Sequence, residues 1–268
     1  MYQFYRYNLD ASSSKIFEEI FENLVIVDSH VHIGRDLDKH VINTKQLVKN
    51  MDYARVNKAI CFPLNNPNYS LSFTKPNDTI YQAYKKYPER IIPFCRLNPR
   101  YSDWKKELEL RVSQGFKGIK LHPRSQRFRI NSSEVKKIIL QAQDNNLIIL
   151  FHTGFGVKYL AEDLLNIIHK FPKVKFILGH SAFPDIHKVI KNMNNQDNVV
   201  FETSTLRTFD IFDLLKNVSY KKIIFGSDIP YYDQVLSLEV LIHTALILKK
   251  TSNQIKEILG ANIIRWLK

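Results

Sequence analysis

Two histidines one residue apart stand at the end of an apolar run near the start of the chain. The run reads Leu24-Val-Ile-Val-Asp-Ser-His-Val-His-Ile-Gly34, and Gly34 ends the pattern. Because side chains alternate between the two faces of a strand, His30 and His32 are expected to point the same way. Two imidazoles on one face make half of a metal site, so further ligands must come from elsewhere in the chain.

Three more of the nine histidines end later apolar runs, and they are His122, His152 and His180. A carboxylate, Asp228, ends another run as Phe-Gly-Ser-Asp-Ile-Pro. Three imidazoles and a carboxylate suit zinc, and manganese, iron or cobalt fit the same donors. We therefore predict one divalent metal, with a coordination position left for water. The predicted ligands are His30, His32, His152 and Asp228.

Eight short apolar runs recur along the chain, without internal repeats or a linker-like stretch. They are Leu24–His30, Lys58–Phe62, Ile91–Leu97, Gly118–His122, Leu147–His152, Lys175–His180, Val199–Thr203 and Lys222–Ser227. Segments with helical spacing lie between and after them, namely Thr44–Arg55, Asn77–Tyr87, Ser102–Ser113, Ser133–Asp144, Val157–Phe171, Pro184–Asn194, Phe209–Asn217 and Asp233–Lys249. Apolar strands that alternate with helices predict a parallel sheet covered by helices.

Eight such units in 268 residues predict an α/β fold, a single (β/α)8 TIM barrel, because that fold typically takes about 250 residues. The predicted domain spans residues 1–268, with an N-terminal helix around Ser14 to Asn23. A final helix that begins at the capping box Thr251-Ser-Asn-Gln254 and ends near Lys268 should close the bottom or side of the barrel. An open doubly wound sheet is the alternative, but no early strand precedes a Gly-x-Gly-x-x-Gly turn.

The barrel explains why the polar residues cluster at run ends. All strands of a parallel barrel end on one face, and active sites of this fold are built there. The five run-end histidines and Asp228 would therefore meet, although they are far apart in sequence.

Composition favours a cytoplasmic protein that acts on a small molecule. No apolar run approaches the ~20 residues of a membrane span, and the first residues lack the apolar core of a signal peptide. The net charge of +13 comes from scattered Lys and Arg without a nucleic-acid motif, so nucleic acid is not expected as a partner. Cys61 and Cys95 lie in apolar segments and are expected to be free thiols.

The motifs together resemble the amidohydrolase superfamily, specifically its amidohydrolase-2 group of metal-dependent hydrolases and decarboxylases. The resemblance covers nearly the whole chain and rests on Val27–Gly34, Gly118–Pro123, Phe151–Gly154, Gly179-His180, Gly226–Asp228 and the closing Gly260-Ala-Asn262 with Arg265. It implies the same four metal ligands and places His180 beside the water or the substrate. Many members carboxylate a strand-four lysine that bridges two metals, but the Lys120-Leu-His-Pro pattern looks like the one-metal branch. Some relatives pass an arginine across a dimer interface, which makes a homodimer one option here, but no residue of this sequence identifies such a donor.

Hydrolysis of an amide, lactone or ester in a small organic substrate, which could be anionic, is the first prediction. A metal ion activates water and polarises a carbonyl group. Asp228 would accept the proton of the water, while His180 would orient the water or stabilise negative charge. Non-oxidative decarboxylation is the alternative, although several aromatic-acid decarboxylases of the group carry glutamate in place of the first histidine, and His30 is retained here. A non-catalytic metal-binding protein is a further alternative.

Substrate recognition should come from the loops after the strands. Lys120, His122 and Arg124 are the predicted substrate-binding residues. The loop Pro123–Asn131 also carries Arg127 and Arg129 around Phe128, and a fork of guanidinium groups suits a carboxylate or phosphate. A solvated basic loop is the competing interpretation. Four aromatic residues are candidates for an apolar wall, and they are Tyr69, Phe73, Tyr231 and Tyr232.

Overall fold

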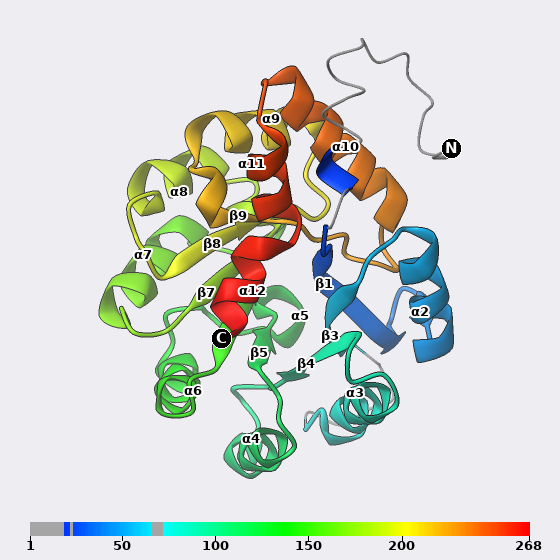
Figure 1. The fold of residues 1–268 in the computed structure, drawn as a ribbon. Coiled ribbons are helices and arrows are strands. Elements are labelled where there is room, and N and C mark those ends of the chain that lie inside the picture. Colours follow the sequence, from blue (N-terminus) through cyan, green and yellow to red (C-terminus); the bar gives the residue numbers. More distant parts are fainter. Residues whose placement is uncertain (1–18, 22–23, 66–71) are drawn as a thin grey trace.

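The structure is a computed structural model that describes residues 19–21, 24–65 and 72–268. Strands and helices alternate along the chain, and each of the eight predicted apolar runs contains a strand (Figure 1). The strands are β1 (Val27–Arg35), β2 (Val41–Ile42), β3 (Lys58–Pro63), β4 (Ile91–Arg96), β5 (Gly118–Leu121), β6 (Ile148–His152), β7 (Phe176–Gly179), β8 (Val199–Glu202) and β9 (Ile223–Ile224). The two-residue strand β2 was not predicted. Residues 19–21 are helical, but most of the predicted N-terminal helix lies outside the described residues.

The strands of the described residues form one sheet in the order β2-β1-β3-β4-β5-β6-β7-β8-β9. β2 pairs antiparallel with β1, and every other pair is parallel. After β9 the chain runs along β1: Ser29 N donates to Phe225 O at 2.9 Å, and Asp228 N donates to His30 O at 2.8 Å. These bonds join the last parallel strand to the first and confirm the predicted TIM barrel.

Each predicted amphipathic segment contains most of one helix, and the ends differ by a few residues. They are α2 (Thr44–Tyr53), α3 (Thr74–Lys86), α4 (Trp104–Ser113), α6 (Ser133–Asp144), α7 (Leu160–Lys170), α8 (Ile186–Met193), α9 (Thr208–Asn217) and α10 (Gln234–Ile247). A short helix that was not predicted, α5 (Pro123–Gln126), lies in the basic loop after β5. Two short 3-10 turns complete the set, η1 (His180–Ala182) and η2 (Tyr220–Lys222).

Side-chain caps account for several helix starts. Ser132 accepts a hydrogen bond from Val135 N, and Asp233 accepts one from Leu236 N. The capping box predicted at Thr251 is present, since its hydroxyl accepts from Gln254 N and the Gln254 side chain accepts from Thr251 N. It begins the continuous C-terminal helix, which consists of α11 (Ser252–Lys256), the π-helical segment η3 (Glu257–Ala261) and α12 (Asn262–Leu267).

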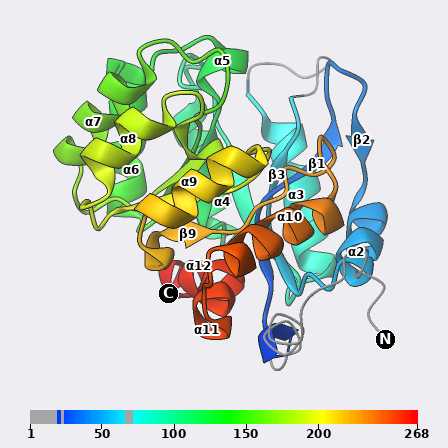
Figure 2. The ribbon, with the colours of Figure 1, turned by 90° about the horizontal axis from the view of Figure 1, so that it is seen from above.

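The two ends of the barrel differ in chemistry. A buried apolar cluster fills the lower interior, with Val27, Phe94, Leu150 and Ile263 among its members, and Trp266 packs against it. Because Ile263 and Trp266 belong to α12, this helix plugs the end of the barrel at which the strands begin, as the sequence predicted. Figure 2 shows α12 and α5 at opposite ends of the molecule. The other end is left for polar residues.

Two further predictions concern chemistry and location. Cys61 and Cys95 are free thiols, both buried in the apolar core as expected. None of the helices in the described part of the chain combines the length and hydropathy that a membrane crossing requires.

Candidate active site

The strand-end residues surround a cavity of about 470 Å³ at the mouth of the barrel. Alternation along each strand explains its lining, because Phe94 and Leu150 face the apolar interior and the residues two positions later point inward one layer higher. The five histidines predicted to meet all line the cavity, and they are His30, His32, His122, His152 and His180. Asp228, Lys120 and Arg124 also line it, so every predicted site residue lies at this one cavity.

Three of the four predicted metal ligands converge on a single point. Asp228 Oδ1 lies 2.9 Å from His32 Nε2 and 3.2 Å from His30 Nε2. All three side chains are buried, and their ligand atoms lie within 4.8 Å of one another. Neutral imidazoles and a carboxylate gathered this closely fit a divalent transition metal.

His152 is not part of that close group, although it faces the same cavity. Its Nδ1 lies 3.0 Å from His180 Nε2, and its ring stacks on His122 with centroids 3.8 Å apart. Its Nε2 is buried without a hydrogen-bond partner. A buried ring nitrogen without a hydrogen-bond partner fits a metal ligand, and the assignment of His152 as the fourth ligand stays a prediction.

Burial keeps these imidazoles uncharged. Desolvation lowers the pKa of His30, His122 and His152 well below the ordinary histidine value, and it lowers the pKa of His180 to about 4. The histidines are therefore neutral at pH 7, which is the form that ligates metals. Asp228 is ionised: burial opposes its ionisation, but the hydrogen bond with His32 and the electrostatic interactions with His180 and Lys120 hold its pKa below the ordinary value.

The sequence reasoning missed Glu202, a fully buried carboxylate at the end of β8. His30 Nδ1 donates to Glu202 Oε2 at 2.8 Å, so the unprotonated Nε2 of His30 faces Asp228. The same carboxylate accepts from His180 N at 3.1 Å and from Ser204 Oγ at 2.8 Å. Glu202 therefore sets the orientation of His30 and holds the turn at His180. A carboxylate at the end of the apolar run Val199–Thr203 was the available signal.

Two glycines make room for this contact. A Cβ on Gly226 would lie 2.0 Å from Glu202 Oε1, and one on Gly179 would lie 3.0 Å from His30 Cε1. Any larger residue at Gly226 would therefore displace the carboxylate that orients His30.

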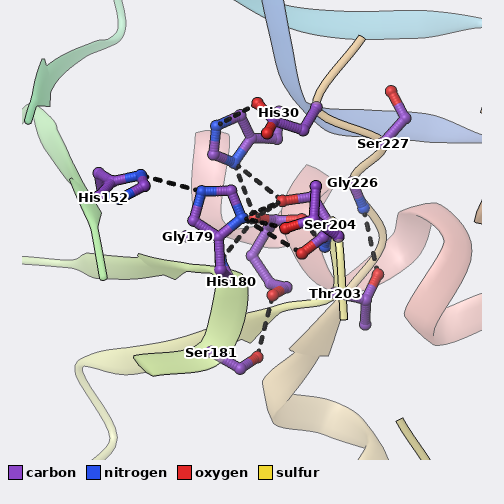
Figure 3. Close-up of polar contacts among 12 residues, drawn as sticks. His30, His152, Gly179, His180, Ser181, Thr203, Ser204, Gly226 and Ser227 are labelled. Atoms are coloured by element: carbon purple, nitrogen blue, oxygen red, sulfur yellow. Dashed lines mark hydrogen bonds and ion pairs between the residues drawn. The ribbon is translucent and has the colours of Figure 1, made fainter. Parts of the chain in front are cut away.

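Hydroxyl groups and the backbone hold His180. Ser204 Oγ and Thr205 Oγ1 each lie 2.9 Å from its Nδ1, and Figure 3 shows His152, His180 and Ser204 joined in series. The backbone of His180 and of Asp228 adopts φ of 66° and 67°, a left-handed conformation that non-glycine residues rarely adopt. Such geometry turns the chain sharply where each strand ends, and the surrounding hydrogen bonds maintain it.

Lys120 is fully buried and contacts the predicted metal ligand His30. Its Nζ lies 2.9 Å from His30 Nε2 and 4.4 Å from the centre of the Phe62 ring. Burial lowers the pKa of Lys120 to about 7. The side chain therefore sits deep in the cavity beside His30.

Two of the three loop arginines line the cavity, and the third lies away from it. Arg124 and Arg127 line the cavity, whereas Arg129 is turned away to a bidentate pair with the buried Asp163. One of the two neighbouring tyrosines also lines the cavity. Tyr231 lies there and its hydroxyl donates a hydrogen bond to Asp36, whereas Tyr232 lines neighbouring depressions.

Of the remaining two aromatic candidates, the structure describes Phe73 alone. Phe73 is buried beneath the guanidinium of Arg96, and Tyr69 lies outside the described residues. Arg96, at the end of β4, is a further cavity residue that the sequence reasoning missed.

A closed parallel barrel whose strand ends gather histidines and a carboxylate is the arrangement of metal-dependent TIM-barrel enzymes. The chain belongs to the amidohydrolase family, in the amidohydrolase-2 group, whose sequence profile matches residues 69–268. This confirms the resemblance inferred from the motifs.

Solved structures share the fold at low sequence identity. A 5-carboxyvanillate decarboxylase from Novosphingobium aromaticivorans, complexed with manganese and 4-hydroxy-3-methoxy-5-nitrobenzoic acid, is 15% identical with a TM-score of 0.74, covering 92% of this chain and 97% of its own. An uncharacterised TIM-barrel protein from Bordetella bronchiseptica is 15% identical with a TM-score of 0.73 and coverages of 91% and 98%. An amidohydrolase from Burkholderia multivorans with bound zinc is 12% identical with a TM-score of 0.71 and coverages of 91% and 99%. A search of curated protein sequences finds no match.

Proposed function

We propose that this protein is a metal-dependent hydrolase that cleaves an amide, lactone or ester bond in a small organic substrate. The convergence of His30, His32 and Asp228 within 4.8 Å carries this proposal. These residues, with His152 as the fourth ligand, would hold one divalent metal, with zinc as the first choice and manganese, iron or cobalt as alternatives. When bound, such an ion lowers the pKa of water and polarises a carbonyl oxygen.

Asp228 is the proposed general base. Its pKa lies below the ordinary carboxylate value, so it is ionised at neutral pH and can accept a proton. It faces the cavity from a backbone held by His30 O, which limits its movement. Proton transfer through a positioned carboxylate is a common way to activate water and then protonate a leaving group.

His180 is the proposed partner in catalysis. The hydroxyls of Ser204 and Thr205 hold one side of its ring, and its Nε2 is directed toward His152. A neutral imidazole can accept a hydrogen bond from a water, or donate one to a water or a carbonyl oxygen. Lys120, His122 and Arg124 line the same cavity and are the proposed substrate contacts.

Non-oxidative decarboxylation of a carboxylic acid is the second candidate. The cavity carries more cationic than anionic side chains, which suits a carboxylic acid. The structurally similar decarboxylase was crystallised with a nitrobenzoic acid and manganese. His30 still favours hydrolysis, because several aromatic-acid decarboxylases of the group carry glutamate there.

The decisive experiment combines metal analysis with a substrate panel. Protein purified without chelator should hold about one equivalent of a divalent transition metal, and His32→Ala should lose it, whereas the exposed His187→Ala should keep it. Esters, lactones, amides and aromatic carboxylic acids are then screened for acid release and for carbon dioxide. Carbon dioxide that tracks turnover would replace the hydrolase with the decarboxylase, and a folded, active, metal-free protein would remove both.

The cellular setting is also part of the proposal. Two buried free thiols fit the predicted cytoplasmic location, which keeps cysteines reduced. The homodimer and the single domain spanning residues 1–268 stay predictions.

A further inference from the structure

Arg96 occupies an unusual position for a charged side chain. It is the last residue of β4, two residues after the interior Phe94, and it lines the cavity although it is only 1% exposed. Its register partner on the neighbouring strand is Lys120. Two buried basic side chains therefore stand side by side on adjacent strands.

The bonds of Arg96 do not pair its charge with a carboxylate, although Asp36 acts on it as a nearby carboxylate. Its guanidinium donates to Ser125 Oγ at 2.6 Å and to Pro63 O at 3.3 Å, both neutral acceptors, and it stacks 4.9 Å from the centre of the Phe73 ring. Its Nε is buried without a hydrogen-bond partner. Across the part of the chain that the structure describes, no carboxylate forms an ion pair with it.

The two buried carboxylates that line the same cavity are already engaged, and the third, Asp38, is exposed. Asp36 accepts from the Tyr231 hydroxyl and from His40 N. Asp228 is paired with His30 and His32. A buried charge is costly unless something pairs with it, and an anion bound in the cavity would supply that pair.

We propose that Arg96 binds a carboxylate group of the substrate and so selects for anionic substrates at this cavity. The planar guanidinium matches a carboxylate in shape and donates charge-assisted hydrogen bonds. Arg124 and Arg127 lie exposed in the following loop, where solvent screens them, whereas Arg96 lies where an ion pair is screened least. That the bound carboxylate belongs to a substrate rests on the proposed function.

The test measures the binding of matched probes by calorimetry, which needs no turnover. Benzoate and 4-hydroxy-3-methoxy-5-nitrobenzoate are compared with the corresponding uncharged carboxamides. Wild-type protein should bind each carboxylate more tightly than its amide. Arg96→Gln should weaken carboxylate binding by about tenfold to a hundredfold, the range expected for a charge-assisted hydrogen bond, and should leave amide binding unchanged. Arg96→Lys should recover part of the loss.

Arg129→Gln is the matched control, because it removes one positive charge away from the cavity. Equal binding of carboxylate and amide by wild type would overturn the assignment. So would carboxylate binding that is unchanged in Arg96→Gln but lost in metal-depleted His32→Ala, because the metal would then hold the carboxylate. A protein that binds carboxylates through Arg96 but turns over neither esters nor acids would keep this inference and refute the proposed function. With a substrate in hand, Arg96→Gln should raise KM more than it lowers kcat.

Discussion

Two arginines of this protein are almost completely buried, and their surroundings differ in kind. Arg111, on α4, donates to Glu107 at 2.6 Å and to Asp78 at 2.8 Å, with further bonds to Gln114 and Thr74 O. Arg96, at the mouth of the barrel, has only neutral acceptors. One arginine is thus paired within the fold, and the other is not.

The titration of the two groups reflects the same difference. Burial by itself would lower the pKa of both arginines. At Arg111 the hydrogen bonds and charges of Glu107 and Asp78 outweigh burial, so its pKa lies above the ordinary arginine value. At Arg96 burial prevails and lowers the pKa to about 10. The paired cluster beneath α3 and α4 serves the fold, whereas the mouth of the barrel carries charges that the fold alone does not explain.

The largest expected effect is the loss of activity in a variant of the cavity at the mouth of the barrel, compared with a loss of stability in a variant of the Arg111 cluster. Asp228→Asn should lower kcat by about a hundredfold to ten-thousandfold, because it removes the proposed base and an anionic ligand. Glu107→Gln, in the paired cluster, should instead lower Tm and leave kcat unchanged. Turnover and thermal unfolding of both variants give the answer, and a Glu107 variant that loses activity at unchanged Tm would break the comparison.

Unfolding in urea compares the two arginines directly. Arg111→Met should lower the free energy of unfolding by about 3–5 kcal/mol, because Glu107 would stay buried with its partner removed. Arg96→Met leaves no carboxylate without a partner, so we expect a change within about 1 kcal/mol or a gain in stability. Equal losses for both variants would show that Arg96 also serves the fold.

Glu202 tests whether the mouth is organised for a metal. Glu202→Gln should weaken metal affinity by about tenfold to a hundredfold, since an amide has one acceptor oxygen in place of the two that hold His30, His180 N and Ser204. Competition with a chromophoric chelator measures this affinity. Glu162→Gln, on the exposed surface of α7, is the control and should bind as wild type. Unchanged affinity in Glu202→Gln would indicate that Glu202 has only a packing role.

The smallest expected effect distinguishes buried from exposed cations within the cavity. Arg124→Gln should weaken benzoate binding by only about twofold to fivefold, the range typical of exposed charge pairs. The contribution of Arg124 should also fade between 0.05 and about 0.5 M salt, while that of Arg96 persists. Titrations at the two salt concentrations test this, and an Arg96 contribution that fades equally would place its charge in solvent.

Much of the fold could be predicted because local patterns carried it. The bounds of α6 match the prediction, and the capping box at Thr251 begins the C-terminal helix as expected. β2 and α5 were missed because two- and four-residue elements have too little periodicity to show. The direction of Arg129 was also beyond the sequence, since the buried Asp163 that turns it away follows 34 residues later.

The candidate site divides along the same line. The sequence alone determined which residues stand at strand ends, because apolar runs and their polar last residues are local features. Only the tertiary structure decided that His30, His32 and Asp228 converge and that Glu202 binds His30 Nδ1. It also decided that, among the described residues, no carboxylate forms an ion pair with Arg96. Barrel closure brings residues nearly 200 positions apart to within 3.2 Å, and the resulting burial determines which charges are paired.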